Sequence, residues 1–471
     1  MQRIEDTTSL ISEAVSDIDD PIWQFELAAL TEASGLAPSK PANFAINAIA
    51  QIIAFKIAIA MLGLLILRYG GTATRRARAT LASTSTVLAL NGEDTTRTRP
   101  LRRALVAYHR ENPDERSAIL LMGRPLSSVS EAFAALDPNA ELSDHSVIRP
   151  LYLGSYLRAV PLIIRQMFAS IEQTTRYRRH IPFKIRIAIA YRMAQGAAYV
   201  RWWERASDGA AISTALFGHT GNADTSQLEQ RMQLQGVTTV HAVHGTNIGW
   251  PFTGLSDVAI FPSGADAKLG RSLPAYGKCT HVPLEPPVVS QGNGTWAVLT
   301  SYTHLQHAAY RTSGAGADIA MVQLVAEAAL QKGQKPADML WRPHPQINLV
   351  DPNEKARLES AIAEAGFARW PDDLPYEALG NFSAVVTTPS TVLTDALRLG
   401  QPAIVAQTAP MQSDLLYSRH PLLVQNSEEL QHALGRVLDP AKRSAAFKDA
   451  WQAIQPGAAY TIEGLIAALD D

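Results

Sequence analysis

Residues that could hold and release a phosphate group follow a buried strand near the C-terminal end of the chain. Residues 339–346 read MLWRPHPQ, so Arg342 and His344 each stand beside a proline that restricts the backbone. Alternation along the strand predicts that both side chains point to one side. A guanidinium can grip a phosphate through two hydrogen bonds, and an imidazole can donate one to a departing oxygen. We predict that Arg342 and His344 do this; a structural turn with an exposed arginine is the alternative.

Four hydroxyl side chains follow a second strand, within residues 385–402, and open a predicted helix. Ser390 is expected to cap this helix and Thr391 to be its first residue. Such an N-terminus favours a diphosphate, and Asp395 in the first turns suits the helix dipole or a ribose hydroxyl. Capping alone explains the same residues, since every helix needs a cap. The predicted phosphate-binding hydroxyls are those of Thr387, Thr388, Ser390 and Thr391.

A candidate general base ends an earlier strand, over residues 237–244. His244 is followed by Gly245 and Thr246, and the glycine permits a tight turn. Ligands of open α/β sheets bind at the carboxyl ends of strands, where a neutral imidazole can take a proton from an attacking hydroxyl. The alternative is a core histidine that bonds a neighbouring carbonyl. Another histidine, His219, lies in a turn that could line the same cleft.

Composition restricts the classes of partner and cofactor. A net charge of −2 argues against nucleic acid as the main partner, and the single cysteine, Cys279, excludes a disulfide framework and fits a reducing compartment. The sequence has no GxxxxGK[ST], HExxH or paired-cysteine motif, so we expect no cofactor and no metal. Residues 1–20 are acidic and polar, which is not the pattern of a secretory signal.

Strands alternate with helices twice along the chain, which predicts two doubly wound parallel sheets with a cleft between them. A flexible break at residues 291–294 separates the two patterns. The predicted domains are residues 1–99, a helical extension, then 100–290 and 291–471. The expected strands cover 117–123, 211–218, 237–244, 257–261, 280–284, 295–301, 339–342, 384–387 and 402–406, and the expected helices include 226–234, 317–331, 354–365 and 391–399.

Two segments are suited to a membrane surface. Residues 44–67 are almost wholly apolar, but Asn47, Gln51 and Lys56 interrupt them, and a span needs about 20 apolar residues. A buried, an interfacial and a spanning helix all remain open. Residues 158–205 carry ten Arg or Lys and two Glu, a local charge of +8, among apolar side chains and two tryptophans. This composition suits an anionic membrane; a solvated helical face that binds a polyanionic substrate is the alternative.

The ordered motifs resemble a known family. His-Gly-Thr at 244–246, Arg-Pro-His-Pro at 342–345, the hydroxyl cluster and Leu-Gly-Gln-Pro at 399–402 make residues 210–406 similar to the CDP-glycerol glycerophosphotransferase superfamily. That group includes teichoic acid polymerases and capsule polysaccharide transferases of the GT-B fold. The most specific of these pieces is Arg-Pro-His-Pro. Asn-Ile-Gly-Trp at 247–250 replaces the lysine usual in the family, and Thr-Thr-Pro-Ser-Thr replaces its Asp-x-Ser-Ser.

The resemblance implies a metal-independent, inverting transfer from a nucleotide-activated donor, CMP-, CDP- or UDP-linked, to a glycan or lipid-linked acceptor. It implies His244 as base, Arg342 and His344 at the donor phosphates, and a polysaccharide as product. It also implies a cytoplasmic protein, peripheral at the inner membrane face, which agrees with contact through residues 44–78, residues 158–205 or both. A GT-B nucleotide-sugar epimerase and a non-catalytic polysaccharide-assembly protein are the rival functions.

Overall fold

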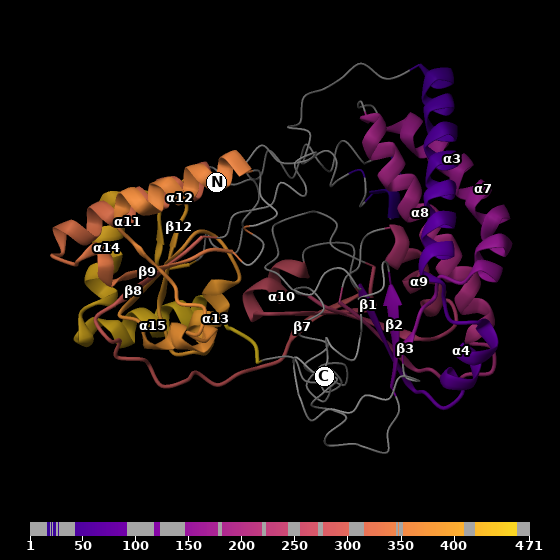
Figure 1. Cartoon of the computed structure of the whole chain (residues 1–471). Helices are drawn as coiled ribbons and strands as arrows, with labels where there is room; N and C mark the ends of the chain where they lie inside the picture. Colours follow the sequence, from indigo (N-terminus) through magenta and orange to yellow (C-terminus); the bar gives the residue numbers. More distant parts are fainter. Residues whose placement is uncertain are drawn as a thin grey trace.

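Two parallel sheets, each covered by helices, organise the protein in its computed structural model (Figure 1). Strands such as Ser117–Met122, Ala384–Thr387 and Ala403–Ala406 are short, mostly apolar runs that are buried on both faces, as is typical of parallel sheets. This confirms the predicted α/β class with two doubly wound domains. The structure describes residues 17–18, 20, 22–24, 27, 43–91, 117–122, 147–177, 181–218, 223–243, 255–271, 277–300, 315–344, 347, 352–408 and 420–458.

The C-terminal sheet has six parallel strands in the order β10-β9-β8-β11-β12-β13. Helices α11 (Gly316–Gln331), α12 (Pro352–Ala365) and α14 (Ser427–Val437) pack on one face, and α13 (Val392–Arg398) and α15 (Pro440–Ile454) on the other. The strands are β8 (Trp296–Leu299), β9 (Met339–Arg342), β10 (Ala368–Arg369), β11 (Ala384–Thr387), β12 (Ala403–Ala406) and β13 (Leu423–Val424).

The N-terminal sheet has seven parallel strands in the order β3-β2-β1-β4-β5-β6-β7. Helices α9 (Ala223–Gln233) and α10 (Gly264–Gly270) follow β4 and β6 along the chain. The strands are β1 (Thr86–Asn91), β2 (Ser117–Met122), β3 (Val147–Ile148), β4 (Thr214–Phe217), β5 (Thr238–Ala242), β6 (Val258–Phe261) and β7 (Lys278–His281). Both sheets therefore start with the Rossmann order, in which the first strand lies between the second and the fourth.

The predicted boundary at residue 99 is corrected by β1. This strand, Thr86–Asn91, lies in the middle of the N-terminal sheet between β2 and β4, so the domain starts before residue 86. The preceding helices α3 (Phe44–Tyr69) and α4 (Thr74–Leu81) contribute to the same hydrophobic core. Residues 44–91 are therefore part of the first domain, because helices α3 and α4 cover one face of the N-terminal sheet.

The basic segment forms two long helices between β3 and β4, namely α7 (Leu153–Arg176) and α8 (Phe183–Ala206). Both pack against α3, and in Figure 1 α3 and α7 lie on the side of the first domain away from the second. Trp202 and Trp203 are fully buried in this layer. They are core residues and not the membrane-facing tryptophans that the basic, apolar composition suggested, because α8 is covered by α3, α7 and α9.

The end of the chain crosses back to the first domain. After α15, Gln455 takes a left-handed conformation (φ 53°), and its carbonyl accepts a 2.8 Å hydrogen bond from the N–H of Gly264. The N–H of Gly457 then donates to the carbonyl of Pro262 at 2.8 Å. These backbone bonds tie residues 455–458 to the loop after β6, so the two domains are joined at two places along the chain.

Candidate donor site

The ends of three neighbouring strands bring the predicted phosphate-binding residues to one edge of the C-terminal sheet. In this strand order the direction of winding reverses between β8 and β11, and such a switch point is where open α/β sheets bind ligands. Leu299 at the end of β8 pairs with Arg342 on one side and with Thr387 on the other. Arg342 and Thr387 are thus level with each other, two strand spacings or about 10 Å apart.

Arg342 lies over two aromatic rings. Its guanidinium carbon is 4.9 Å from the ring centre of Trp370 and 4.7 Å from that of Tyr376. Trp370 follows β10, and its backbone N–H donates to the carbonyl of Trp341 at 2.9 Å, which holds the residue beside β9, while its indole N–H donates to the carbonyl of Leu374 at 2.9 Å. A stacked guanidinium donates its hydrogen bonds within its own plane. The two rings therefore hold Arg342 in one orientation at the edge of the sheet.

Tyr376 connects Arg342 to the helix that follows β11. Its hydroxyl donates to Asp395 Oδ2 at 3.1 Å, and Asp395 Oδ1 forms a 3.0 Å ion pair with Arg398. Burial, then the charge and hydrogen bond of Asp395, raise the pKa of Tyr376. The phenol stays protonated and remains a donor to Asp395. Asp395, predicted as a dipole partner or ribose ligand, is in the structure the acceptor that links Tyr376 with Arg398.

The hydroxyl cluster is divided between the two faces of the sheet. Thr388 Oγ1 donates to Asp318 Oδ1 of α11 at 2.8 Å, whereas Thr387 Oγ1 donates to the carbonyl of Thr388 at 2.8 Å and lies 3.2 Å from Ser390 Oγ. Both threonines are buried and Ser390 and Thr391 are half-buried. Successive residues at the end of a strand face opposite ways, so Thr387 and Thr388 brace the loop with bonds inside the protein.

The helix after this loop starts one residue later than predicted. It begins at Val392, with Thr391 before it in a helical conformation and without a side-chain capping bond. Ser390 Oγ accepts from the N–H of Val392 at 3.3 Å, so the predicted serine does satisfy an amide of the first turn. The observed capping contact and the predicted phosphate contact therefore involve the same hydroxyl.

His344 lies two residues beyond the end of β9 and is half-buried. Its carbonyl accepts a 2.9 Å hydrogen bond from the N–H of Ile347, which forms a turn directly after the strand. The predicted residues His219, His244, Gly245 and Thr246 lie outside the described residues. Their proposed roles stay predictions, as does the absence of a metal requirement.

Four residues of this edge were not predicted from the sequence. Asp318 lies in the first turn of α11, Trp370 follows β10, Tyr376 begins a 3-10 helix (Tyr376–Asn381), and Arg398 ends α13. Asp318 follows the known preference of acids for a first helical turn, which could have identified it. Trp370 and Tyr376 have no such local signal, because only the sheet brings them beside Arg342.

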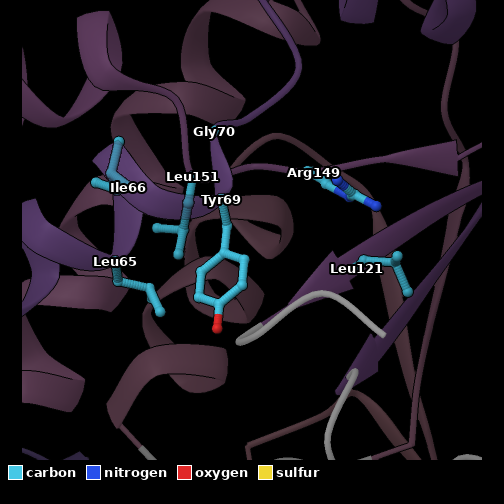
Figure 2. Close-up of a pocket in the computed structure, with 7 residues that line it drawn as sticks. All are labelled: Leu65, Ile66, Tyr69, Gly70, Leu121, Arg149 and Leu151. Carbon is cyan, nitrogen blue, oxygen red and sulfur yellow. The ribbon is translucent and has the colours of Figure 1, made fainter. Parts of the chain in front are cut away.

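Two hollows in the structure lie away from this edge. One, of about 10 Å³, has room for a single water and lies where the end of α3 meets β2 and the segment after β3, with Tyr69 beside Leu65 (Figure 2). The other, of about 390 Å³, runs along β13 and α14 and is lined by His432 and Arg436 among others. Neither has a lining residue in common with the predicted donor site.

No protein-family model matches the chain, and no curated protein matches it. Among solved structures it is similar to a UDP-GlcNAc 2-epimerase from Neisseria meningitidis bound to UDP-GlcNAc, at 8% identity over 82% of this chain and 98% of that one, with TM-score 0.46. It is also similar to an alpha,alpha-trehalose 6-phosphate synthase from Burkholderia multivorans, at 11% identity over 82% and 98%, with TM-score 0.46. A glycosyltransferase from Rickettsia africae matches at 9% identity over 82% and 97%, with TM-score 0.44. These values carry no argument about chemistry, and the fold assignment rests on the strand order of the two sheets.

Proposed function

We propose that the protein is a GT-B transferase that moves a group from a nucleotide-activated donor to a glycan or lipid-linked acceptor, and so builds a surface polysaccharide or related glycopolymer. One observation carries the proposal. The switch point between β8 and β11 has Thr387 on one side and, level with it, Arg342 on β9. A cation and hydroxyls at the carboxyl edge of a Rossmann sheet suit a nucleotide diphosphate.

Each group at this edge has a distinct role in the proposal. Arg342, held over Trp370 and Tyr376, neutralises the donor phosphates without losing side-chain freedom at the moment of binding. Ser390 and Thr391 donate to the same phosphates. Thr387 and Thr388 keep the loop in shape through their bonds inside the protein.

Transfer then proceeds with inversion. His244 takes the proton of the acceptor hydroxyl as its oxygen bonds to the donor group, and the bond from that group to the phosphate breaks. The electron pair leaves with the nucleotide, where Arg342 and His344 stabilise the new charge on the phosphate oxygen. Such a reaction needs no metal, because protein cations take over the neutralisation.

The test is a thermal-shift screen of the purified protein with CMP, CDP, UDP, UDP-sugars and GDP, with and without EDTA. One nucleotide should raise the melting temperature equally in both conditions. Arg342→Ala should lose most of that shift, while Arg369→Ala, which removes an exposed arginine from the adjacent strand β10, should keep it. Equal shifts in the two variants would remove Arg342 from the donor site, and product formed without an acceptor would favour an epimerase.

A further inference from the structure

Helix α3 is apolar on its outward side, where a helix on the surface of a soluble domain has polar residues. Its inward side is mostly apolar as well, but contains two polar residues. Asn47 and Gln51 are both only 2% exposed. The outward side is apolar, interrupted by Lys56. Its exposed large side chains at helical spacing are Ile46, Ile49, Ile53, Met61, Leu64 and Leu67. An exposed apolar stripe of this length indicates a surface that meets a protein or a membrane.

The neighbouring helix α7 extends this stripe. The hydroxyl of Tyr156 donates to the carbonyl of Ile59 at 2.8 Å, and Asn47 donates to Thr174 at 3.1 Å, so α3 and α7 run antiparallel and side by side. Large apolar side chains are also exposed along one side of α7. They are Leu153, Leu157, Ile164 and Phe168, and their spacing of four, seven and four residues keeps them on one side of the helix.

Cations accompany these apolar residues. Arg158 and Arg165 are exposed on α7, each one residue after an apolar member of the stripe, and Arg68, Arg75 and Arg76 are exposed at the end of α3 and on α4. Residues 44–91 contain no aspartate or glutamate, and the one acid of α7, Glu172, forms a 2.6 Å ion pair with Arg176. The exposed sides of α3 and α7, hereafter the α3–α7 face, therefore combine apolar side chains with a net positive charge.

We infer that the α3–α7 face binds an anionic lipid bilayer, with both helices lying in the plane of its interface. An in-plane helix buries one apolar side among the acyl chains while basic residues meet the headgroups. A second copy of the chain would bring two positive faces together, which charge repulsion disfavours. The inference does not depend on the proposed transfer reaction.

The packing of α3 supports an in-plane position over a spanning one. By length and composition this helix could cross a membrane, as could the core helix of a soluble protein. Its inner side, however, is bonded to charged and polar groups of the domain. Asn47 Oδ1 accepts from buried Arg186 of α8 at 2.6 Å, and its amide bonds Thr175 of α7 at 2.9 Å. Taking α3 across a bilayer would break these bonds or draw Arg186 into hydrocarbon, which is costly.

The test is sedimentation of the full chain with vesicles of equimolar phosphatidylcholine and phosphatidylglycerol, and with vesicles of phosphatidylcholine alone. The protein should pellet with the anionic vesicles and should be released by high salt. Leu64→Asp should weaken binding about tenfold or more. Leu330→Asp is the matched control, because Leu330 on α11 of the other domain has the same 68% exposure as Leu64. Equal binding by these two variants would overturn the inference.

The arginines of the α3–α7 face are tested separately, with an arginine of the other domain as control. Arg158→Glu with Arg165→Glu should reduce binding to the anionic vesicles, while Arg369→Glu, on the other domain, should not. Binding that resists both high salt and alkaline carbonate would indicate a spanning helix and contradict the in-plane position. A wild-type dimer in solution that Leu64→Asp converts to a monomer would show that a second copy covers the face. If the protein bound no nucleotide, the results expected with vesicles would stay the same.

Discussion

At the scale of single residues, a row of contacting side chains that starts with Arg342 shapes the carboxyl edge of the C-terminal sheet. This edge, where the proposed donor binds, is called the donor edge below. The two rings beneath its guanidinium hold the cation in one orientation before any ligand arrives, and the hydroxyl of Tyr376 donates to Asp395. Asp395 in turn holds Arg398. Charge and packing thus cooperate, because a preorganised arginine loses less freedom when it binds.

Tyr376 offers a pair of variants that separates its ring from its hydroxyl. Tyr376→Phe keeps the ring under Arg342 and should change nucleotide affinity little, whereas Tyr376→Ala should weaken it about tenfold through the lost cation–π contact. Isothermal titration with the nucleotide found in the thermal screen measures both. If the two variants lose affinity equally, the hydroxyl and not the ring is what positions Arg342.

His420 predicts a pH dependence of stability. It is buried, Nε2 donates to the carbonyl of Ala403 at 2.7 Å, and burial lowers its pKa to about 4. The unfolded chain binds this proton from about pH 6.5 downward. The neutral histidine therefore contributes fully above that pH, and up to about 3 kcal/mol is lost as the pH falls toward 4.

Urea unfolding of the wild type and of His420→Gln between pH 7 and pH 4.5 checks this prediction, with the pH values chosen to bracket that titration. The wild type should be more stable at pH 7, and the difference should shrink as the pH falls. The carboxylates common to both proteins cancel in the comparison. A difference that stays constant with pH would mean that the buried histidine does not take up a proton on unfolding.

At the scale of elements, α3 is held by a buried polar cluster and not by apolar packing alone. Asn47 bonds α7 through Thr174 and Thr175 and bonds α8 through Arg186, whose Nε also donates to the carbonyl of Ile181 at 3.1 Å. Burial lowers the pKa of Arg186. The helices bury the guanidinium of Arg186, and the cluster supplies its hydrogen-bond acceptors. These bonds fix which side of α3 faces inward.

The two partners of this cluster should contribute to stability jointly and not additively. Asn47→Leu leaves Arg186 buried with fewer acceptors and should lower the free energy of unfolding by about 3 kcal/mol. Asn47→Leu with Arg186→Met should cost less than the sum of the two single changes. Urea unfolding of the three variants completes the cycle, and additive losses would mean that the two residues act independently.

At the scale of the whole molecule, Arg398 connects the donor edge with the place where the chain crosses between domains. Its Nε donates to the carbonyl of Gly457 at 2.6 Å, and a terminal nitrogen donates to the carbonyl of Pro262 at 3.1 Å. The same guanidinium pairs with Asp395. The side chains that position Arg342 are therefore in contact, through Arg398, with the loop after β6 of the first domain.

Arg398→Gln should loosen this crossing. Loss of bonds to two carbonyls and one carboxylate should lower the free energy of unfolding by about 3 kcal/mol, with faster hydrogen exchange at Gly264 and Gly457. The control is Arg436→Gln, which removes the arginine of a surface ion pair with Asp449 in the same domain. Unchanged exchange at both glycines in Arg398→Gln would show that the backbone bonds alone hold the joint.

The sequence by itself determined the local elements of the donor edge. The strands Met339–Arg342 and Ala384–Thr387 have the predicted limits, because each is a short apolar run that a polar, proline-containing loop ends. The alternation of strands and helices along the chain likewise determined the α/β class. These features depend on side chains close together in sequence, so periodicity and turn residues reveal them.

Only the tertiary structure decided which distant residues meet. It placed Thr86–Asn91 at the centre of the first sheet, because hydrogen bonds to β2 and β4 define that position and no local pattern does. It brought Trp370 and Tyr376 under Arg342 and Asp318 of α11 to the hydroxyl of Thr388. It also turned Asn47 inward, where its side-chain oxygen accepts from buried Arg186 of α8, and left an apolar stripe of α3 exposed.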